Sequence, residues 1–439
     1  MLQKLLLFLI LSPYLLSCQN TLQGEFSPAE DYDFVILYLR NPTGKVYIAD
    51  TKVDATGKFK IDLDPEALQA TYQLVYKLPE EEHNFDLVYD GKEEVDLKFS
   101  EKEGLIFKNG QNKILSEYLQ EMKIIQKEIN STLSSDKERI KQLFSRQKEI
   151  QKKAEKASEN TFAHTFVIAN SPYIPDEFIN KEVYEINRKS NFFENFDFND
   201  AHLQSSSFPL KMIENYYHEF VTLKKGINYQ SAINDIHLEL KNTNPSFQKT
   251  LLAEFWRNLI AENKNNAANY LAQRYLIPLS NSLEDIELSE NLQQFKNLSM
   301  GAKAPNFALV NYDSHKTLYD LEGADYYILA FWSTECSHCM KHIPEIYERL
   351  KTISSDKMKV IAVGLELEDT IWRKKTLELP QFINVLAMDQ YLNELVKEYN
   401  VRATPTFFVV DKDKKIIAKP SGVKNLYEII DALEQYQKP

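Results

Sequence analysis

Cysteine is scarce in this sequence, and positive charges are outnumbered by negative ones. Three of the 439 residues are cysteines, Cys18, Cys336 and Cys339. Lys and Arg total 52 against 64 Asp and Glu, which gives a formal net charge of -12. A negatively charged chain without a stripe of basic residues argues against binding to the phosphates of nucleic acids. The length predicts about two to four folded domains.

The amino terminus carries a long apolar run, MLQKLLLFLILSPYLLSC. Lys4 precedes the apolar segment from Leu5 to Leu16, which is the pattern of a secretion signal. A transmembrane anchor is the alternative, but Pro13 interrupts the run, which is shorter than the roughly 20 apolar residues that a spanning helix needs. We therefore expect residues 1–17 to be a signal peptide.

The signal ends in Leu15-Leu16-Ser17-Cys18, which resembles the lipobox of bacterial lipoproteins. The resemblance implies lipidation of the Cys18 thiol, cleavage just before this residue and acylation of the new amino terminus. Several acyl chains anchor a protein stably where one does not. We therefore expect a lipid-anchored protein of the cell envelope, on the outer membrane facing the periplasm, with display on the cell surface as the alternative.

Residues 18–108 alternate apolar and polar side chains in short runs such as DFVILYLR and TYQLVYKL. Turn residues such as Asn41-Pro42-Thr43-Gly44 separate these runs. Alternation with a period of two predicts strands, so we expect an all-β, antiparallel domain of the sandwich type. Because no catalytic groups cluster here, a role as a spacer or a partner-docking domain is favoured.

Residues 109–298 change to a helical period. Apolar side chains recur every three or four residues at Ile114, Tyr118, Met122, Ile125, Ile129 and Leu133. A second amphipathic run, Lys137 to Ala157, predicts the other half of a helical hairpin. Further helices are expected at Phe208 to Leu223, Tyr229 to Leu240, Pro245 to Asn263 and Asn265 to Leu276.

Aromatic residues are frequent in this helical region. They include Phe192, Phe193, Phe196, Phe198, Tyr216, Tyr217 and Phe220. A cofactor box is one interpretation, but aromatic residues at helical spacing more often form core, which is the interpretation we favour. The histidines of the region, His164, His202, His218 and His237, are too dispersed for a metal motif.

Residues 299–439 alternate apolar strands with helical segments, which predicts an α/β layer structure. An apolar strand is expected from Tyr326 to Trp332, followed by helices at Met340 to Ile353 and Leu392 to Tyr399. The segment TFFVVDKDKKIIAK predicts an antiparallel hairpin at the edge of the sheet, with its turn at Asp411 to Lys414.

The stretch FWSTECSHCMKHIPEI places two cysteines three residues apart, just after the predicted strand. A helix that begins near Cys336 would put this residue in the first turn, where unpaired N–H groups and the helix dipole stabilise a thiolate. Cys339 would lie one turn further along, within reach of the same sulfur. The pair therefore favours reversible disulfide exchange, and lipidation of Cys18 would leave no other cysteine for a structural disulfide.

Several motifs make residues 299–439 similar to the thioredoxin superfamily, and most similar to envelope-anchored thiol-disulfide oxidoreductases of the TlpA and ResA type. These motifs are Ala304-Pro305-Asn306-Phe307, FWSTECSHC, Pro344, GLELEDTIW and Val401-Arg402-Ala403-Thr404-Pro405-Thr406. ADTKVDATGKFKIDL in the β domain similarly resembles a hairpin that precedes thioredoxin modules in envelope lipoproteins. The resemblance implies a thioredoxin-like domain at 299–439.

The resemblance also implies a catalytic arrangement. Thr404-Pro405 would be a cis peptide bond beside the cysteines, with the Thr404 backbone pairing with a substrate segment. The Cys336 thiolate would attack a disulfide of an envelope protein, and Cys339 would release the reduced product. The implied electron donor is a membrane redox protein, and the redox-active disulfide would be the sole redox group, with no bound cofactor or metal.

Two histidines, and the absence of the acidic residue that relatives carry near the cysteines, modify this expectation. His338 stands where more oxidising relatives carry histidine, so we predict a reduction potential less reducing than that of thioredoxin. Ala330 and His342 occupy two positions where relatives carry an acidic residue. His342 is one candidate to relay the proton of Cys339, because imidazole titrates near neutral pH; a half-exposed histidine without such a role is the alternative.

Two cysteines at this spacing can also serve purposes other than disulfide exchange. Haem attachment requires histidine directly after the second cysteine, where Met340 stands. A lipoprotein that binds and delivers zinc or copper is a second interpretation, with Cys336, Cys339, His338 and His342 as ligands. A third is a lipoprotein that binds a partner without catalysis and carries a relic thioredoxin domain.

Overall fold

The computed structural model describes residues 20–221 and 228–435. The chain forms two compact units, which divide between Phe255 and Trp256. Within the described ranges, no helix is both long enough and apolar enough to cross a membrane. The predicted signal peptide and lipidation site at Cys18 lie outside the described residues.

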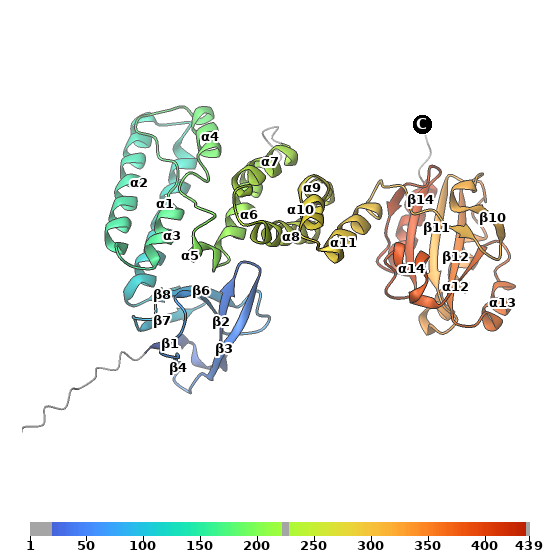
Figure 1. The fold of residues 1–439 in the computed structure, drawn as a ribbon, viewed down its shortest axis with the longest axis horizontal. Helices are drawn as coiled ribbons and strands as arrows, with labels where there is room; N and C mark the ends of the chain where they lie inside the picture. Colours follow the sequence, from blue (N-terminus) through green and yellow to red (C-terminus); the bar gives the residue numbers. More distant parts are fainter. Residues whose placement is uncertain (1–19, 222–227, 436–439) are drawn as a thin grey trace, which may run out of the picture. The chain divides into compact units, whose positions relative to one another are not determined.

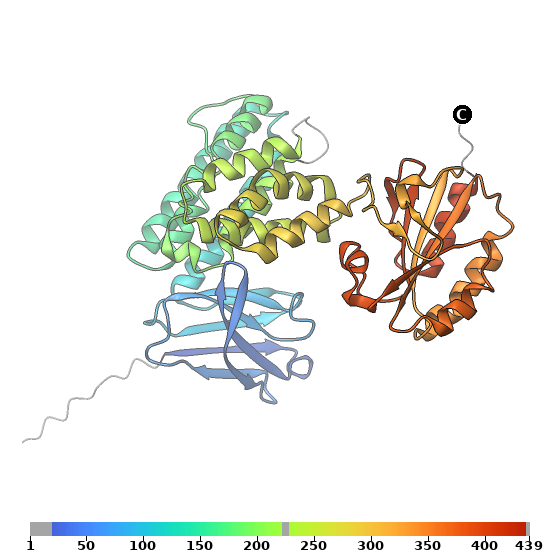
Figure 2. The same ribbon diagram turned by 45° about the vertical axis from the view of Figure 1, so that its right-hand side comes forward.

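The β domain of the first unit is a sandwich of two four-stranded sheets (Figures 1 and 2). The strands are β1 (Thr21–Ser27), β2 (Phe34–Asn41), β3 (Gly44–Lys52), β4 (Lys58–Asp62), β5 (Ala70–Val75), β6 (Asn84–Tyr89), β7 (Val95–Ser100) and β8 (Gly104–Phe107). One sheet has the order β4-β1-β7-β8 and the other β3-β2-β5-β6. Alternate residues such as Leu22, Leu37 and Leu97 are fully buried between the sheets.

The prediction of a wholly antiparallel domain was wrong at one pair of strands. Strand β1 runs parallel to β7, with Leu22 opposite Val95. The expected pairing within ADTKVDATGKFKIDL was also wrong, because β3 pairs with β2 and β4 pairs with β1 in the opposite sheet. Gly57, at φ +83°, lies in the tight turn between them. Alternation specifies which face of a strand is buried, but not its partner.

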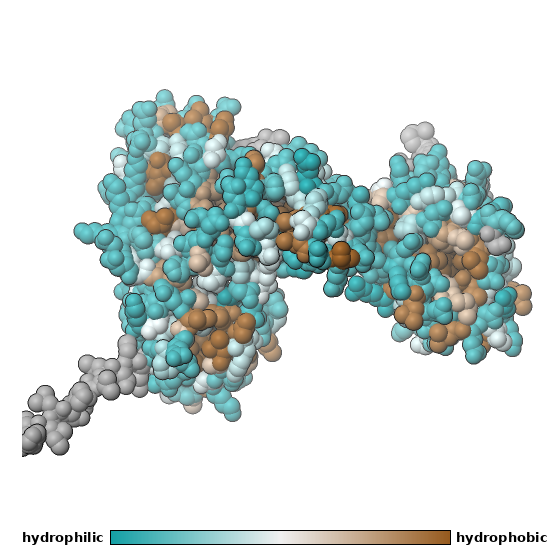
Figure 3. All heavy atoms as spheres, viewed as in Figure 1, coloured by the Kyte–Doolittle hydropathy of each residue, from teal (hydrophilic) through white to brown (hydrophobic). Residues whose placement is uncertain are grey.

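The surface of the β domain carries an apolar patch over β2 and β3 (Figure 3). Strand β3 lies at the edge of its sheet and exposes Val46, Tyr47 and Ile48 by 55%, 56% and 39%. Exposed apolar side chains that gather in a patch often mark an interaction surface. The predicted docking role of the β domain stays a prediction.

The helical region follows the β domain. Its helices are α1 (Gly110–Thr132), α2 (Lys137–Ser158), α3 (Ala163–Ala169), α4 (Lys181–Ser190), α5 (Ala201–Gln204), α6 (Phe208–Val221), α7 (Tyr229–Leu240), α8 (Pro245–Ala261), α9 (Asn265–Leu271), α10 (Ile277–Ser282) and α11 (Ile286–Asn297). The predicted hairpin of α1 and α2 is present, and the Asp136 carboxylate caps α2 by accepting from the Arg139 N–H at 2.9 Å. The expected helix at Asn265 to Leu276 is interrupted by a π-helical turn at Ala272–Leu276.

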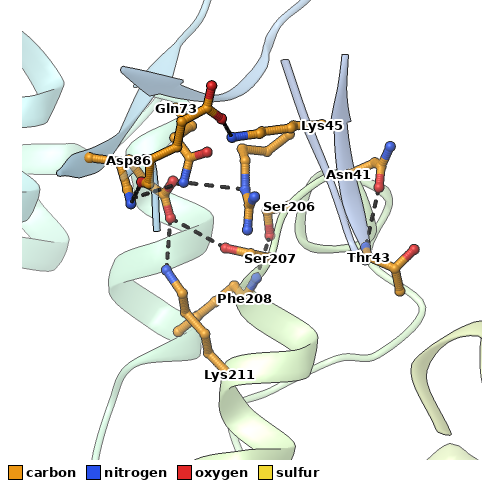
Figure 4. Close-up of polar contacts among 12 residues, drawn as sticks. Asn41, Thr43, Lys45, Gln73, Asp86, Ser206, Ser207, Phe208 and Lys211 are labelled. Atoms are coloured by element: carbon orange, nitrogen blue, oxygen red, sulfur yellow. Dashed lines mark hydrogen bonds and ion pairs between the residues drawn. The ribbon is translucent and has the colours of Figure 1, made fainter. Parts of the chain in front are cut away.

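Side chains from the β domain and from these helices bond directly within the first unit. Figure 4 shows the Asp86 carboxylate of β6 accepting hydrogen bonds from Lys211 in α6 and from Ser207 just before it, at 2.7 and 3.3 Å. The Asn112 amide of α1 bonds both the N–H and the carbonyl of Val88. These contacts join the β domain to α1 and α6 within the first unit.

Five of the seven aromatic residues named in the helical region form core, as their spacing predicted, whereas Phe192 and Phe220 are half-buried. Phe193, Phe196, Phe198, Tyr216 and Tyr217 are buried. The rings of Phe193 and Tyr216 lie 4.8 Å apart, within the range of favourable aromatic contact.

The C-terminal domain is a five-stranded sheet with helices packed on both faces, as expected for the predicted α/β layer structure (Figures 1 and 2). Its elements are β9 (Ala308–Leu309), β10 (Asp313–Thr317), β11 (Tyr326–Trp332), α12 (Ser337–Leu350), β12 (Met358–Glu366), α13 (Thr370–Thr376), β13 (Ile383–Met388), α14 (Glu394–Glu398), β14 (Thr406–Asp411), β15 (Ile416–Ala418) and α15 (Val423–Gln435). The sheet order is β13-β12-β11-β14-β15, with β9 and β10 paired separately. Strands β11, β12 and β13 are parallel, whereas β14 and β15 form the predicted edge hairpin.

One close contact in this domain gives a stability prediction. A Cβ atom added to Gly364 in β12 would lie 2.1 Å from Nε1 of Trp372, whose side chain is buried on α13. We expect Gly364→Ala to lower the free energy of unfolding by about 1–3 kcal/mol, the usual cost of overpacking a core. The control is Gly422→Ala, because an added Cβ there meets no atom within 4 Å. Equal denaturation midpoints for the two variants would contradict this prediction.

Candidate active site

The candidate site lies where strand β11 leads into helix α12. The strand ends at Trp332, a turn spans Ser333 to Glu335, and the helix begins at Ser337 with Cys336 as its N-cap residue. The Cys336 sulfur accepts a hydrogen bond from the Cys339 N–H at 3.2 Å, as a capping serine or aspartate oxygen commonly does. The predicted position of Cys336 at the helix start is therefore confirmed.

The two thiols occupy different environments. Both cysteines are free, Cys336 partly exposed and Cys339 fully buried. Burial acts to raise the pKa of Cys336, but hydrogen bonds from the Cys339 thiol and from nearby backbone N–H groups outweigh it, so that the pKa is lowered. Burial together with the hydrogen bond to Cys336 raises the pKa of Cys339 to about 12. The pair thus has one thiol suited to ionise and one suited to remain protonated.

The expected proline lies across from the cysteines. The Thr404–Pro405 peptide bond is cis, as the sequence resemblance implied. The Cys336 thiol donates a hydrogen bond to the Thr404 carbonyl oxygen at 3.2 Å. This contact places the end of the loop before β14 against the partly exposed sulfur. Catalytic roles for Thr404 and Pro405 stay predictions.

The two histidines lie on the same helix as the cysteines. Their rings are nearly parallel, at 7°, with centroids 6.5 Å apart. His338 is exposed, whereas His342 is half-buried and its Nδ1 lies 2.8 Å from Glu345 Oε2. The hydrogen bond of His342 is therefore directed to Glu345. The proposed proton relay from Cys339 to His342 stays a prediction.

The effect of His338 on the reduction potential can be measured directly. A cation or hydrogen-bond donor in the first turn of α12 would favour the Cys336 thiolate and therefore the reduced protein. We expect a potential above the roughly -270 mV of thioredoxin, and His338→Ala should shift it to a more negative value. Titration against glutathione measures both. His315→Ala is the control, because that side chain is 95% exposed on β10. A thioredoxin-like value for the unmodified protein would contradict the prediction.

The structure reveals one acidic residue near the site that sequence analysis missed. Glu366 ends strand β12 and is only 2% exposed. Its Oε1 accepts from the Thr334 N–H, and its Oε2 accepts from the Thr334 hydroxyl, both at 2.7 Å. Burial raises the pKa of this carboxyl group, although the bonds from Thr334 oppose the shift. An acidic residue at the end of the otherwise apolar run KVIAVGLE was the available signal.

The metal-binding interpretation gains no geometric support. Among residues 20–221 and 228–435, no three side chains of His, Cys, Asp or Glu are grouped so that they could hold a metal ion. His342, one of the four ligands considered, is paired with Glu345.

The similarity of this chain to known proteins lies in the same C-terminal domain. Residues 300–419 match the AhpC/TSA family. Thiol-disulfide oxidoreductase ResA of Bacillus thuringiensis subsp. konkukian is 30% identical over 142 residues, which cover 32% of this chain and 78% of the relative. ResA of Bacillus subtilis is 27% identical over 129 residues, covering 29% and 70%.

Solved structures are similar over the same region. A domain of a possible thiol-disulfide isomerase from Cytophaga hutchinsonii is 30% identical, with a TM-score of 0.28, and covers 31% of this chain and 95% of that domain. A thioredoxin-like protein from Bacteroides caccae is 20% identical, with a TM-score of 0.31 and coverage of 61% and 98%.

The fold and the sequence matches define a thioredoxin-like domain. The chain belongs to the family of ResA-like thiol-disulfide oxidoreductases.

Proposed function

We propose that the C-terminal domain reduces disulfide bonds of cell-envelope proteins, with Cys336 as the attacking thiolate and Cys339 as the resolving thiol. The supporting observation is the position of the Cys336 sulfur. It caps helix α12 at 3.2 Å from the Cys339 N–H and lies 3.2 Å from the Thr404 carbonyl oxygen. It is also the more exposed of the two thiols.

In the proposed reaction, the Cys336 thiolate attacks one sulfur of the substrate disulfide. A mixed disulfide forms, and the other substrate sulfur leaves as a thiolate that takes up a proton. Cys339 then loses its proton and attacks the Cys336 sulfur, which expels the second substrate sulfur as a thiolate that takes up a proton in turn. The substrate gains two electrons and two protons in all, and the enzyme is left with a Cys336–Cys339 disulfide.

Because the pKa of Cys339 is raised, the second step requires a base. A thiol with a pKa of about 12 must be deprotonated as it attacks. The departing substrate thiolate is a base available at that moment. The oxidised enzyme then requires a dithiol donor, for which we propose a membrane redox protein, and no bound cofactor besides the disulfide itself.

Reduction of insulin tests the proposed activity. The purified protein, with dithiothreitol as the source of electrons, should accelerate the precipitation of reduced insulin chains well above the rate with dithiothreitol alone. A rate no higher than this background would contradict the proposal and favour a thioredoxin-like domain without catalytic activity.

The proposed location follows from Cys18. A lipid anchor at this residue would hold the enzyme at the outer membrane and limit its substrates to neighbouring envelope proteins. Cys18→Ser should transfer the protein from the membrane fraction to the soluble fraction of cells. Unchanged membrane association of the variant would refute anchoring through this thiol.

A further inference from the structure

Glu366 occupies an unusual position for a carboxylate. It is the one acidic side chain that is fully buried in the described part of the chain, 2% exposed at the end of β12. Burying an ionised carboxylate is costly unless hydrogen bonds compensate for the lost water. Both of its oxygens accept hydrogen bonds from Thr334, through the N–H and the hydroxyl, and the neighbouring Ser333 side chain also bonds the carboxylate. The carboxylate therefore clamps Thr334 at two points.

The residue that Glu366 holds lies in the turn that delivers the nucleophile. The Cys336 N–H donates to the Ser333 carbonyl oxygen at 3.2 Å, and the Glu335 N–H donates to the Ser333 hydroxyl at 3.1 Å. These two bonds remain inside the turn. The bond from the Thr334 N–H to Glu366 ties the backbone of the turn to strand β12.

The position of this turn determines the environment of the Cys336 sulfur. The sulfur caps α12 only while Cys336 keeps its extended conformation, at φ -90° and ψ 109°. Rotation of the turn would move the sulfur away from both the Cys339 N–H and the Thr404 carbonyl oxygen. Loss of the capping bond would return the thiol toward its ordinary pKa of about 8.5.

We propose that Glu366 is a positioning residue for Cys336: its carboxylate holds the Ser333–Glu335 turn by two hydrogen bonds to Thr334 and so keeps the nucleophilic sulfur on the N-terminus of α12. This inference rests on the proposed role of Cys336 as the nucleophile. Glu366 is thus a buried carboxylate beside the site, and it comes from strand β12. The two positions where relatives carry an acidic residue are occupied by Ala330 and His342.

Four substitutions separate hydrogen bonding from charge. Glu366→Ala removes both bonds to Thr334. Glu366→Gln keeps the shape of the side chain and both bonds, because the amide oxygen can accept from the Thr334 N–H while the amide N–H donates to the hydroxyl. Thr334→Val removes only the hydroxyl bond. Glu335→Gln removes the charge of the exposed neighbour whose carboxylate raises the pKa of Glu366.

The readout is the rate at which iodoacetamide alkylates Cys336 in the reduced full-length protein, followed from pH 5 to pH 10. This reaction needs no disulfide substrate, so its outcome is independent of insulin reduction. We expect Glu366→Ala to react at least about ten-fold more slowly at pH 7, because the rate follows the thiolate fraction. Thr334→Val should be slowed less, while Glu366→Gln should stay within about two-fold of the unmodified protein. Glu335→Gln should react no more slowly than that protein.

Two results would overturn the inference. Unchanged alkylation of Glu366→Ala would show that the turn holds its position without the carboxylate. A Glu366→Gln variant as slow as Glu366→Ala would show that the charge, and not the pair of hydrogen bonds, is required. If Glu366→Ala does not fold, Thr334→Val decides the question: alkylation at the unmodified rate would reject the proposed clamp.

Discussion

Cys336→Ser is expected to reduce insulin no faster than the dithiothreitol background. A serine hydroxyl cannot form the mixed disulfide, so both steps of the proposed reaction disappear. Its oxygen could still accept the Cys339 N–H bond at the start of α12, where serine is a favoured capping residue. We therefore expect the variant to remain folded while its activity falls to background, a loss that reports on chemistry and not on stability.

The matched control for this experiment is Ser337→Ala, which changes the adjacent exposed side chain and leaves both thiols in place. It should retain most of the activity. Appreciable insulin reduction by Cys336→Ser would mean that another group carries the reaction, and the assignment of the nucleophile would be wrong.

Cys339→Ala is expected to trap substrate as a covalent mixed disulfide. The substitution keeps the backbone N–H that bonds the Cys336 sulfur, so the first attack can still occur. It removes the thiol that would release the product. Since the hydrogen bond from the Cys339 side chain helps to lower the pKa of Cys336, that pKa should rise part of the way to its ordinary value and slow the first attack modestly.

The expected result is a fall of steady-state insulin reduction to near background, accompanied by adducts that disappear when excess dithiothreitol is added. Non-reducing electrophoresis and mass spectrometry would detect them, with Cys336→Ser as the variant that forms none. In cell extracts, the same adducts would identify the natural substrates. Full turnover by Cys339→Ala would show that the second thiol is not needed.

The core of the site could be predicted because its causes are local in sequence. The apolar run from Tyr326 to Trp332 specifies a buried strand, and the polar turn after it leads into a helix. Those two features alone place Cys336 at a helix N-terminus and Cys339 one turn further along. The cis bond at Pro405 required the family resemblance, because trans is the usual state of such bonds.

Features that depend on long-range packing could not be read in this way. Glu366 meets Thr334, 32 positions away in sequence, only because β12 pairs in parallel with β11. Helices α4 and α11 were not predicted from the sequence, and each buries a single side chain, Tyr184 or Leu292. The parallel pairing of β1 with β7 likewise cannot be predicted from the alternation of apolar and polar residues along each strand.

The central claim is that Cys336 is ionised at the end of α12 while Cys339 stays protonated, and the pH dependence of alkylation for each cysteine of the reduced protein measures it most directly. Since a lowered pKa preserves the thiolate to lower pH, the reactivity of Cys336 should persist below pH 8.5 and decline only as the pH falls through its lowered pKa. Cys339, with a pKa of about 12, should stay unreactive up to pH 10. A Cys336 that titrates at or above its ordinary pKa, or a Cys339 that reacts first, would contradict the account.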